Sequence, residues 1–316
     1  MQCGVATAVA PSPREGRTTV PDDASTQDLA EATEAFEQCR RRLFGIAYRM
    51  LGSVADAEDI LQDVWIRWQS TRRDEVIEPT AFLSTITTRL SINSLQSAHT
   101  RRETYIGPWL PEPVNTADDP SLGAERGEAL QYAMLILLEK LTPTERAAYV
   151  LREAFDYPYD RIASIVQTTP ASARQLVSRA RKHLASERRA TVATREQRRL
   201  LEAFLSAAQR GNADALEELF AADVVSYTDG NGVKLAARIP VIGQSRVAKF
   251  VAAFSSHFWS GKTIDWVEVN GQPAVTLSED GVITTALTVT ATPDGIRQLL
   301  WIMSPDKLRH VTTVGA

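Results

Sequence analysis

Apolar side chains between residues 29 and 103 recur every three or four positions, the spacing that gathers them on one face of an α-helix. The pattern breaks at Gly52-Ser53 and begins again at Pro79, so it predicts three helices, of which the first two form a hairpin. We expect a helical domain over residues 26–103, after a flexible tail over residues 1–25 that is rich in Pro, Ser, Thr and Gly. The predicted inward-facing residues are Phe36, Leu43, Ile46, Ala47, Met50, Leu51, Ala57, Ile60, Leu61, Val64, Trp65, Trp68, Phe82, Leu83, Ile86, Leu90 and Leu95.

The outward faces of the second and third helices differ in charge. The second helix is strongly acidic on its outward face, whereas the third is polar or basic. Acidic side chains are repelled by DNA, so a basic protein surface is the natural partner of the second helix; a merely solvated face is the alternative. The acidic-face residues are Asp56, Glu58, Asp59, Gln62 and Asp63. The candidate nucleic-acid-binding residues of the third helix are Arg89, Asn93, Gln96, Arg101 and Arg102.

The stretch from Leu141 to Leu184 predicts a helix-turn-helix. Thr142-Pro143-Thr144-Glu145 has the sequence of a capping box, with a hydroxyl at the N-cap, proline at the first helical position and a carboxylate three residues on. Thr169-Pro170 opens the last helix, which has the pattern of a recognition helix that enters the major groove of DNA. The outward-facing candidates on this helix are Ser172, Arg174, Gln175, Ser178, Arg179 and Lys182.

Basic charge is concentrated on this last helix, although the chain as a whole is acidic. Residues 171–190 hold six Lys or Arg against one Glu, whereas the 316-residue chain has 35 Lys and Arg against 39 Asp and Glu, a formal net charge of −4. Charge that is segregated in this way is typical of a phosphate-binding surface. An ordinary solvated surface helix is the weaker interpretation.

Residues 104–128 are expected to form an extended linker to a second helical domain over residues 129–190. Trp109-Leu110-Pro111-Glu112-Pro113 cannot lie inside a helix, because proline lacks the backbone donor and restricts the residue before it. Residues 111–128 carry five acidic side chains against one basic side chain. A plain hydrophilic tether is the alternative, but a large apolar ring such as that of Trp109 has no use in a solvated tether.

Residues 195–316 are predicted to form an α+β domain in which helices precede a mostly antiparallel sheet. Turns are expected at Asp229-Gly230-Asn231-Gly232 and at Pro293-Asp294-Gly295. The predicted strands cover residues 224–228, 233–239, 264–270, 274–277, 282–290 and 296–303, and the predicted helices cover residues 195–210, 213–220 and 245–256.

Composition excludes several classes of protein. The sequence has no run near the roughly eighteen consecutive apolar residues of a membrane span and no signal-peptide pattern, so we expect a cytoplasmic protein that does not bind membranes. Two cysteines, Cys3 and Cys39, and four scattered histidines support neither a disulfide framework nor a metal site. We expect no cofactor.

The combination of acidic hairpin, basic third helix, linker and helix-turn-helix resembles the core of the extracytoplasmic-function (ECF) sigma factors, the specificity subunits of bacterial RNA polymerase. Residues 56–65 are similar to sigma region 2.2, residues 81–102 to regions 2.3 and 2.4, and residues 141–184 to region 4. The resemblance covers about residues 29–189.

Three further motifs resemble those of the ECF subgroup that carries a C-terminal SnoaL-like domain. They are the Trp109–Pro113 motif of the linker, the turn over residues 229–234 and the Ser304-Pro305-Asp306-Lys307-Leu308 motif. Asn231 stands where the subgroup has a glycine, a mild change because Asn tolerates positive backbone angles. Ser304 stands where the subgroup has an asparagine.

The resemblance implies a multidomain fold, with two all-α sigma domains (a region 2 helical bundle and a region 4 helix-turn-helix) followed by an α+β SnoaL-like cone-shaped barrel. It implies that the acidic-face residues bind the clamp helices of the largest subunit of core RNA polymerase. The third helix would then recognise the −10 element of promoter DNA as a single strand, and the recognition helix would recognise the −35 element. The linker would run through the polymerase cleft.

The C-terminal domain has two interpretations. SnoaL-like barrels enclose a pocket and include enzymes, which leaves open a small-molecule ligand. Because the domain is fused to a sigma factor, we favour a regulator in cis that is not an enzyme. The expected regulatory contact residues are Asp229, Lys234, Asp306 and Lys307. For the whole chain, the alternative is a stand-alone helix-turn-helix transcription regulator with a ligand-binding or enzymatic barrel.

Overall fold

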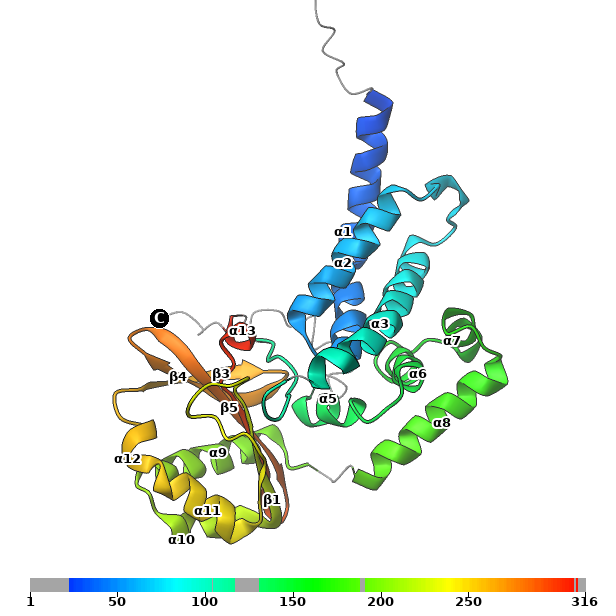
Figure 1. Ribbon diagram of the computed structural model, residues 1–316. Helices are drawn as coiled ribbons and strands as arrows, with labels where there is room; N and C mark the ends of the chain where they lie inside the picture. Colours follow the sequence, from blue (N-terminus) through cyan, green and yellow to red (C-terminus); the bar gives the residue numbers. More distant parts are fainter. Residues whose placement is uncertain (1–22, 104, 117–130, 188–190, 310, 312–316) are drawn as a thin grey trace, which may run out of the picture.

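The computed structural model describes residues 23–103, 105–116, 131–187, 191–309 and 311. A helical part is followed by a C-terminal part in which helices cover one face of a sheet (Figure 1). Most of the predicted tail and the linker acids Asp118, Asp119, Glu125 and Glu128 lie outside the described residues. In the described residues, no helix is both long enough and apolar enough to span a membrane.

The first helices form the predicted hairpin and a third helix packed on it. The first helix ends at Leu51, and Gly52 adopts a φ of +67°, which turns the chain. Ser53 then caps the second helix, because its side chain accepts a hydrogen bond from the Asp56 backbone N–H at 3.1 Å. The elements are α1 (Asp23–Leu51), α2 (Val54–Gln69), the short 3₁₀ helix η1 (Arg73–Glu75) and α3 (Pro79–Glu103).

The helix-turn-helix also begins as its sequence predicts. The Thr142 side chain accepts from the Glu145 backbone N–H, and the Glu145 carboxylate accepts from the Thr142 backbone N–H, which completes a capping box. Before the last helix, Thr169 caps through its hydroxyl, which accepts from the Ser172 N–H at 3.1 Å. The elements are α5 (Tyr132–Leu138), α6 (Pro143–Glu153), α7 (Tyr159–Ile165) and α8 (Pro170–Glu187).

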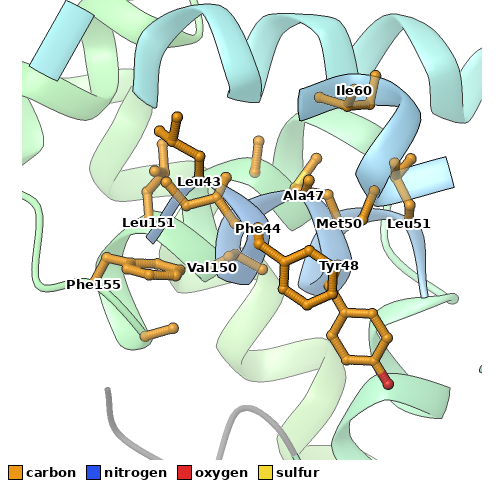
Figure 2. Close-up of a cluster of buried hydrophobic side chains, with 14 of the residues drawn as sticks. Leu43, Phe44, Ala47, Tyr48, Met50, Leu51, Ile60, Val150, Leu151 and Phe155 are labelled. Atoms are coloured by element: carbon orange, nitrogen blue, oxygen red, sulfur yellow. The ribbon is translucent and has the colours of Figure 1, made fainter. Parts of the chain in front are cut away.

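The two helical regions share one hydrophobic core. Leu43 and Phe44 of α1 belong to the same buried cluster as Val150 and Leu151 of α6 and the following Phe155 (Figure 2). Polar contacts cross the same boundary, because Arg146 of α6 donates to the carbonyl oxygen of Met50 at 2.6 Å. The regions are therefore packed against each other, not merely tethered by the linker.

The C-terminal part contains a six-stranded sheet with strand order β2-β1-β6-β5-β4-β3. All neighbouring strands are antiparallel except β1 and β6, which are parallel. Helices α9–α11 lie on one face of the sheet (Figure 1). The elements are α9 (Thr194–Gln209), α10 (Ala213–Leu219), β1 (Phe220–Asp229), β2 (Val241–Ile242), α11 (Gln244–Ala253), α12 (Ser255–Phe258), β3 (Thr263–Val269), β4 (Gln272–Glu279), β5 (Val282–Thr292), β6 (Gly295–Ile302) and α13 (Pro305–Leu308).

Both faces of this sheet are buried. Alternate strand residues such as Val275 and Leu299 pack against the helices, whereas their neighbours Ala274 and Leu300 face the opposite side. On that opposite side the sheet packs against Leu110 of the linker, together with Tyr132 and Leu308. The linker is thus part of the core of the C-terminal part.

One predicted strand, over residues 233–239, is wrong. Val233 donates to the Gly230 carbonyl and Ala236 to the Val233 carbonyl, so the segment closes on itself in turns. The apolar side chains that suggested a strand are instead exposed, by 59% at Leu235 and 75% at Ile239. The strand that pairs with β1 here is the two-residue β2, after Pro240.

Candidate functional surfaces

The acidic face of α2 is open to a partner at its centre. Asp59, Gln62 and Asp63 are exposed, whereas Glu58 forms an ion pair of 2.6 Å with Arg40 of α1. Asp56 is half-buried at the start of the helix. A hollow of about 500 Å³ adjoins this face, with acidic side chains beside the apolar rings of Phe36 and Trp65, whose centroids are 5.1 Å apart. Charge and apolar surface are therefore available together, as protein interfaces require.

The predicted nucleic-acid face of α3 is partly occupied. Asn93 and Gln96 are exposed. Arg89 instead donates from Nε to the Ile165 carbonyl at 3.0 Å and from Nη2 to the Ser164 carbonyl at 2.9 Å. These carbonyls end α7, where the helix dipole favours a cation, so Arg89 joins the two helical regions. The side chains of Arg101 and Arg102 lie outside the part of the chain whose side chains are described.

The last helix presents its polar face to solvent. Its apolar residues Ala173, Val177, Ala180 and Leu184 are buried against the rest of the helix-turn-helix. Of the predicted reading residues, Ser172 is half-buried and the remaining five are exposed: Arg174, Gln175, Ser178, Arg179 and Lys182. An exposed row of polar and basic side chains is what insertion into a major groove needs.

Two of these arginines have partners within the helix-turn-helix. Arg179 forms an ion pair of 3.1 Å with Glu145, and the Arg174 guanidinium lies 5.3 Å from the ring centroid of Tyr159. Partial burial favours the protonated form of Glu145, but hydrogen bonds from Thr142 and Arg179 outweigh it and lower the pKa of this carboxyl.

A buried polar cluster connects the C-terminal domain to the linker. The Asp229 carboxylate lies at the end of β1 and the Lys307 ammonium on α13, with Nζ 2.6 Å from Oδ2 and side-chain exposures of 0% and 6%. We call these two residues the clamp. Asp229 accepts hydrogen bonds from the Tyr105 hydroxyl and, at 2.6 Å, from the Leu110 N–H. Lys307 donates to the Leu110 carbonyl and lies 4.2 Å from the ring centroid of Trp109.

The clamp combines two motifs that are distant in the sequence. The turn after β1 lets Asp229 face the linker, and Asn231 in that turn adopts a φ of +43°. The other two predicted contact residues of these motifs are placed differently: Lys234 is exposed, and Asp306 is exposed, pairs with Arg309 at 2.5 Å and acts on Tyr105 through its charge. The pKa of the Tyr105 hydroxyl is raised far above its usual range by burial, by its hydrogen bond to Asp229 and by the negative charge of Asp229. A hydrogen bond with Ser304 acts in the opposite direction.

Further along the linker, Glu112 caps the second helix, α2. Its carboxylate accepts from the Ser53 hydroxyl at 2.8 Å and from the Val54 N–H at 2.6 Å. The Glu112 carbonyl accepts from the Tyr48 hydroxyl at 2.6 Å, and Tyr48 in turn accepts from the Asn270 amide at 2.8 Å. Burial raises the pKa of Tyr48 far above its usual value, so it stays a neutral donor.

The linker also adds to the edge of the sheet. The Asn270 N–H donates to the Val114 carbonyl at 2.9 Å, and the Asn270 side chain accepts from the Val114 N–H at 3.1 Å. Sequence reasoning did not single out Tyr48, Tyr105 or Asn270, and it counted Glu112 only as one of the acidic side chains of the linker. Its position between two prolines was the available signal that Glu112 is held in place.

Comparison with known proteins identifies the family. The family model "Sigma-70 region 2" matches residues 35–101, and "Sigma-70, region 4" matches residues 133–184. The chain is 36% identical over 287 residues to "ECF RNA polymerase sigma factor SigJ" of Mycobacterium tuberculosis, which covers 86% of this chain and 91% of SigJ. The chain belongs to the ECF sigma factors.

Other relatives agree with this assignment. The chain is 28% identical over 278 residues to "Probable ECF RNA polymerase sigma factor SigI" of Mycobacterium tuberculosis, covering 87% of this chain and 93% of SigI. The crystal structure of Mycobacterium tuberculosis SigJ superimposes with a TM-score of 0.72 at 31% identity, covering 89% of this chain and 99% of that one. The match supports the predicted order of two helical sigma regions and an α+β, SnoaL-like domain.

As an ECF sigma factor, the chain directs transcription initiation, with sigma regions that bind RNA polymerase and promoter DNA. Sigma factors are generally not enzymes. The alternative of a stand-alone transcription regulator is not favoured, because region 2 is present together with region 4.

Proposed function

We propose that the chain is an ECF sigma factor whose C-terminal domain controls initiation in cis by holding the linker. The clamp carries this proposal, because it binds the linker through buried, charge-assisted contacts at Tyr105, Trp109 and Leu110. A segment that only tethers two domains does not require buried contacts with charged side chains. The linker must leave this site to enter a polymerase cleft, so the clamp opposes that step.

The polymerase contact is assigned to the acidic face of α2. Asp59, Gln62 and Asp63 are exposed beside the hollow that contains Trp65. Their proposed partner is the pair of clamp helices in the largest subunit of RNA polymerase, which are not to be confused with the clamp formed here by Asp229 and Lys307. Complementary charge would speed and orient docking. Glu58 acts mainly within the chain, because it is paired with Arg40.

Promoter recognition is assigned to two helices. On α8, Arg174, Gln175, Ser178 and Arg179 are proposed to read bases of the −35 element with Ser172, and Lys182 is proposed to contact phosphate. On α3, Asn93 and Gln96 are proposed to contact the −10 strand together with Arg89, Arg101 and Arg102. Arg89 has to release its two hydrogen bonds to the α7 carbonyls before it can bind DNA, so promoter binding would compete with this contact between the two sigma regions.

Domain control and a small-molecule signal are compatible. A ligand that binds the C-terminal domain more tightly in one state of the clamp would shift the population of that state. Binding of the ligand to the C-terminal domain would then change how often the linker is held by the clamp.

Reconstitution tests the proposal. The full chain added to core RNA polymerase should give initiation from a cognate promoter selected from a random library, and Asp59→Lys should abolish it and abolish co-purification with the polymerase. Glu58→Gln is the matched control, because it removes an acid on the same helix that is already paired. Absence of initiation by the full chain and by Lys307→Met, in which the clamp is broken, would contradict the assigned function.

A further inference from the structure

A basic surface continues past the recognition helix into the first helix of the C-terminal domain. Residues 171–199 hold nine Lys or Arg against two Glu, in a chain whose formal net charge is −4. The part of this charge that lies on α9 consists of Arg195, Arg198 and Arg199, and all three residues are exposed. Positive charge that is concentrated in one segment of an acidic protein is typical of a surface that binds phosphates.

The three arginines share one side of α9. Positions 195, 198 and 199 are three or four residues apart along the helix, so their side chains are neighbours on its surface. The opposite side of α9, with Leu201 and Phe204, packs against the sheet in the buried core of the C-terminal part. The arginine side of the helix therefore faces solvent.

One of these arginines is oriented by an aromatic ring. The Arg198 guanidinium lies 4.2 Å from the ring centroid of Trp266 on β3, and Trp266 is half-buried. Stacking uses the face of the guanidinium and leaves the N–H groups at its edge able to donate to phosphate oxygens. Because the ring already restricts the side chain, less conformational entropy is lost when Arg198 binds a partner.

The acid nearest to this surface is Glu196. It forms an ion pair of 2.6 Å with Arg199, and both side chains are exposed. Exposed ion pairs contribute little free energy, so a phosphate can compete with Glu196 for Arg199 at small cost. Arg195 and Arg198 are therefore the main positive groups of the surface, and Glu196 is the group that opposes an anionic partner.

The start of α9 stays close to any DNA that α8 binds. Residues 188–193 join Glu187, the last residue of α8, to Thr194, the first residue of α9 (Figure 1). A chain of this length spans at most about 25 Å, which corresponds to about seven nucleotides along one strand of a duplex. The covalent chain sets this limit, so it holds whether or not the clamp retains the linker.

We propose that Arg195, Arg198 and Arg199 form a second DNA-binding surface, which contacts the phosphate backbone of the duplex next to the −35 element. This inference rests on the proposed assignment of α8 to that element. Phosphate contacts carry no sequence information, so the C-terminal domain adds affinity for promoter DNA while α8 reads the bases. Duplex DNA is the partner that fits, because the surface continues the positive charge of the recognition helix.

The first test compares two labelled duplexes for binding to holoenzyme reconstituted from core RNA polymerase and the full chain. One duplex is limited to the −35 sequence that the wild type selects, and the other extends it by about ten base pairs, one helical turn, on each side. The wild type should bind the extended duplex more tightly. The double variant Arg195→Gln/Arg198→Gln should bind it about tenfold more weakly at about 0.1 M salt, with the slope of log affinity against log salt reduced by about 2.

Arg210→Gln is the matched control for the double variant. Arg210 is an exposed arginine at the opposite end of α9, so its loss should leave both the affinity and the salt dependence unchanged. Arg198→Lys, which keeps the charge, should retain most of the affinity for the extended duplex.

Glu196→Gln tests the same surface by a gain of binding, which a folding defect does not produce. Removal of this acid should strengthen binding to the extended duplex about threefold and steepen its salt dependence. Glu218→Gln, at an exposed acid of α10, should do neither.

The proposal is overturned if the double variant keeps the affinity and salt slope of the wild type, or if Glu196→Gln binds no more tightly than Glu218→Gln. An equal loss on the short and the extended duplex would also overturn it, because the arginines would then not contact flanking DNA. Failure of the α8 assignment is seen separately: Arg174→Ala and Arg179→Ala would leave the preference for the −35 sequence unchanged, although the double variant loses affinity.

Discussion

Lys307 and Asp229 lie 78 residues apart in the chain and form an ion pair of 2.6 Å that is almost completely buried. Burying both charges is costly, and only additional hydrogen bonds make such a pair favourable. Here the linker supplies them, through the Tyr105 hydroxyl and both backbone polar groups of Leu110. The pair therefore depends on the linker for these additional hydrogen bonds, and under the proposed cis control release of the linker would leave the two buried charges less well satisfied.

Lys307→Met should expose this dependence. It leaves the Asp229 carboxylate buried without a cation, so the free energy of unfolding should fall by about 3–5 kcal/mol. Hydrogen exchange at the Leu110 amide should accelerate in parallel. Lys234→Met, at the exposed lysine of the neighbouring motif, should change neither quantity. Adding Asp229→Asn to Lys307→Met should recover part of the stability, and no recovery would contradict a direct pair.

Glu112→Gln tests whether the linker supports the polymerase-binding helix. The substitution keeps the shape of the side chain but removes the charge at the positive end of α2, so we expect a loss of about 1–2 kcal/mol in unfolding free energy. Ser53→Ala, which removes the local cap, should cost about 1 kcal/mol. Because the Ser53 hydroxyl donates to Glu112, the two losses should not add in the double variant. Full additivity in chemical denaturation would show that the contact contributes nothing.

Arg89→Ala should separate two roles of one side chain. Loss of its hydrogen bonds to the Ser164 and Ile165 carbonyls should accelerate hydrogen exchange in α7, and loss of a cation should weaken binding to single-stranded −10 DNA. Asn93→Ala, at an exposed position of the same helix, should weaken DNA binding without changing exchange in α7. If both variants leave α7 unchanged, Arg89 does not hold the sigma regions together.

Local features of this fold could be predicted from the sequence because neighbouring residues determine them. The Thr142–Glu145 capping box, the turn at Gly52 and the alternation of Ala274 with Val275 all follow from rules that act within a few residues. The segment over residues 233–239 misled the same reasoning, because exposed apolar residues in a turn look like those of a strand.

Contacts between distant residues could not be predicted in this way. The bond from the Asn270 amide to Tyr48 joins positions 222 apart, and the Glu112 carboxylate reaches Val54 across 58 positions. The spacing of apolar and polar residues along the chain carries no information about contacts between residues so far apart. The motif match named Asp229 and Lys307 as expected contact residues, but only the fold shows that they pair with each other and that Tyr105 joins them.

The pairing of Glu145 with Arg179 predicts a pH dependence for the helix-turn-helix. The folded-state pKa of Glu145 lies below its unfolded value of about 4.3, so its stabilising contribution is present above that pH and is lost as pH falls through the folded pKa. Glu145→Gln should therefore lower the melting temperature at neutral pH and reduce its further fall on acidification towards about pH 4.

The same substitution should also change DNA binding, because Arg179 would lose its anionic partner and become available to the −35 element. Glu153→Gln is the control: it removes the same charge from an ion pair with Arg181, which is not a proposed base reader. Glu145→Gln should strengthen duplex binding and alter promoter preference at neutral pH, whereas Glu153→Gln should strengthen binding to all sequences alike. Identical promoter preference in the two variants would remove Arg179 from the proposed readers.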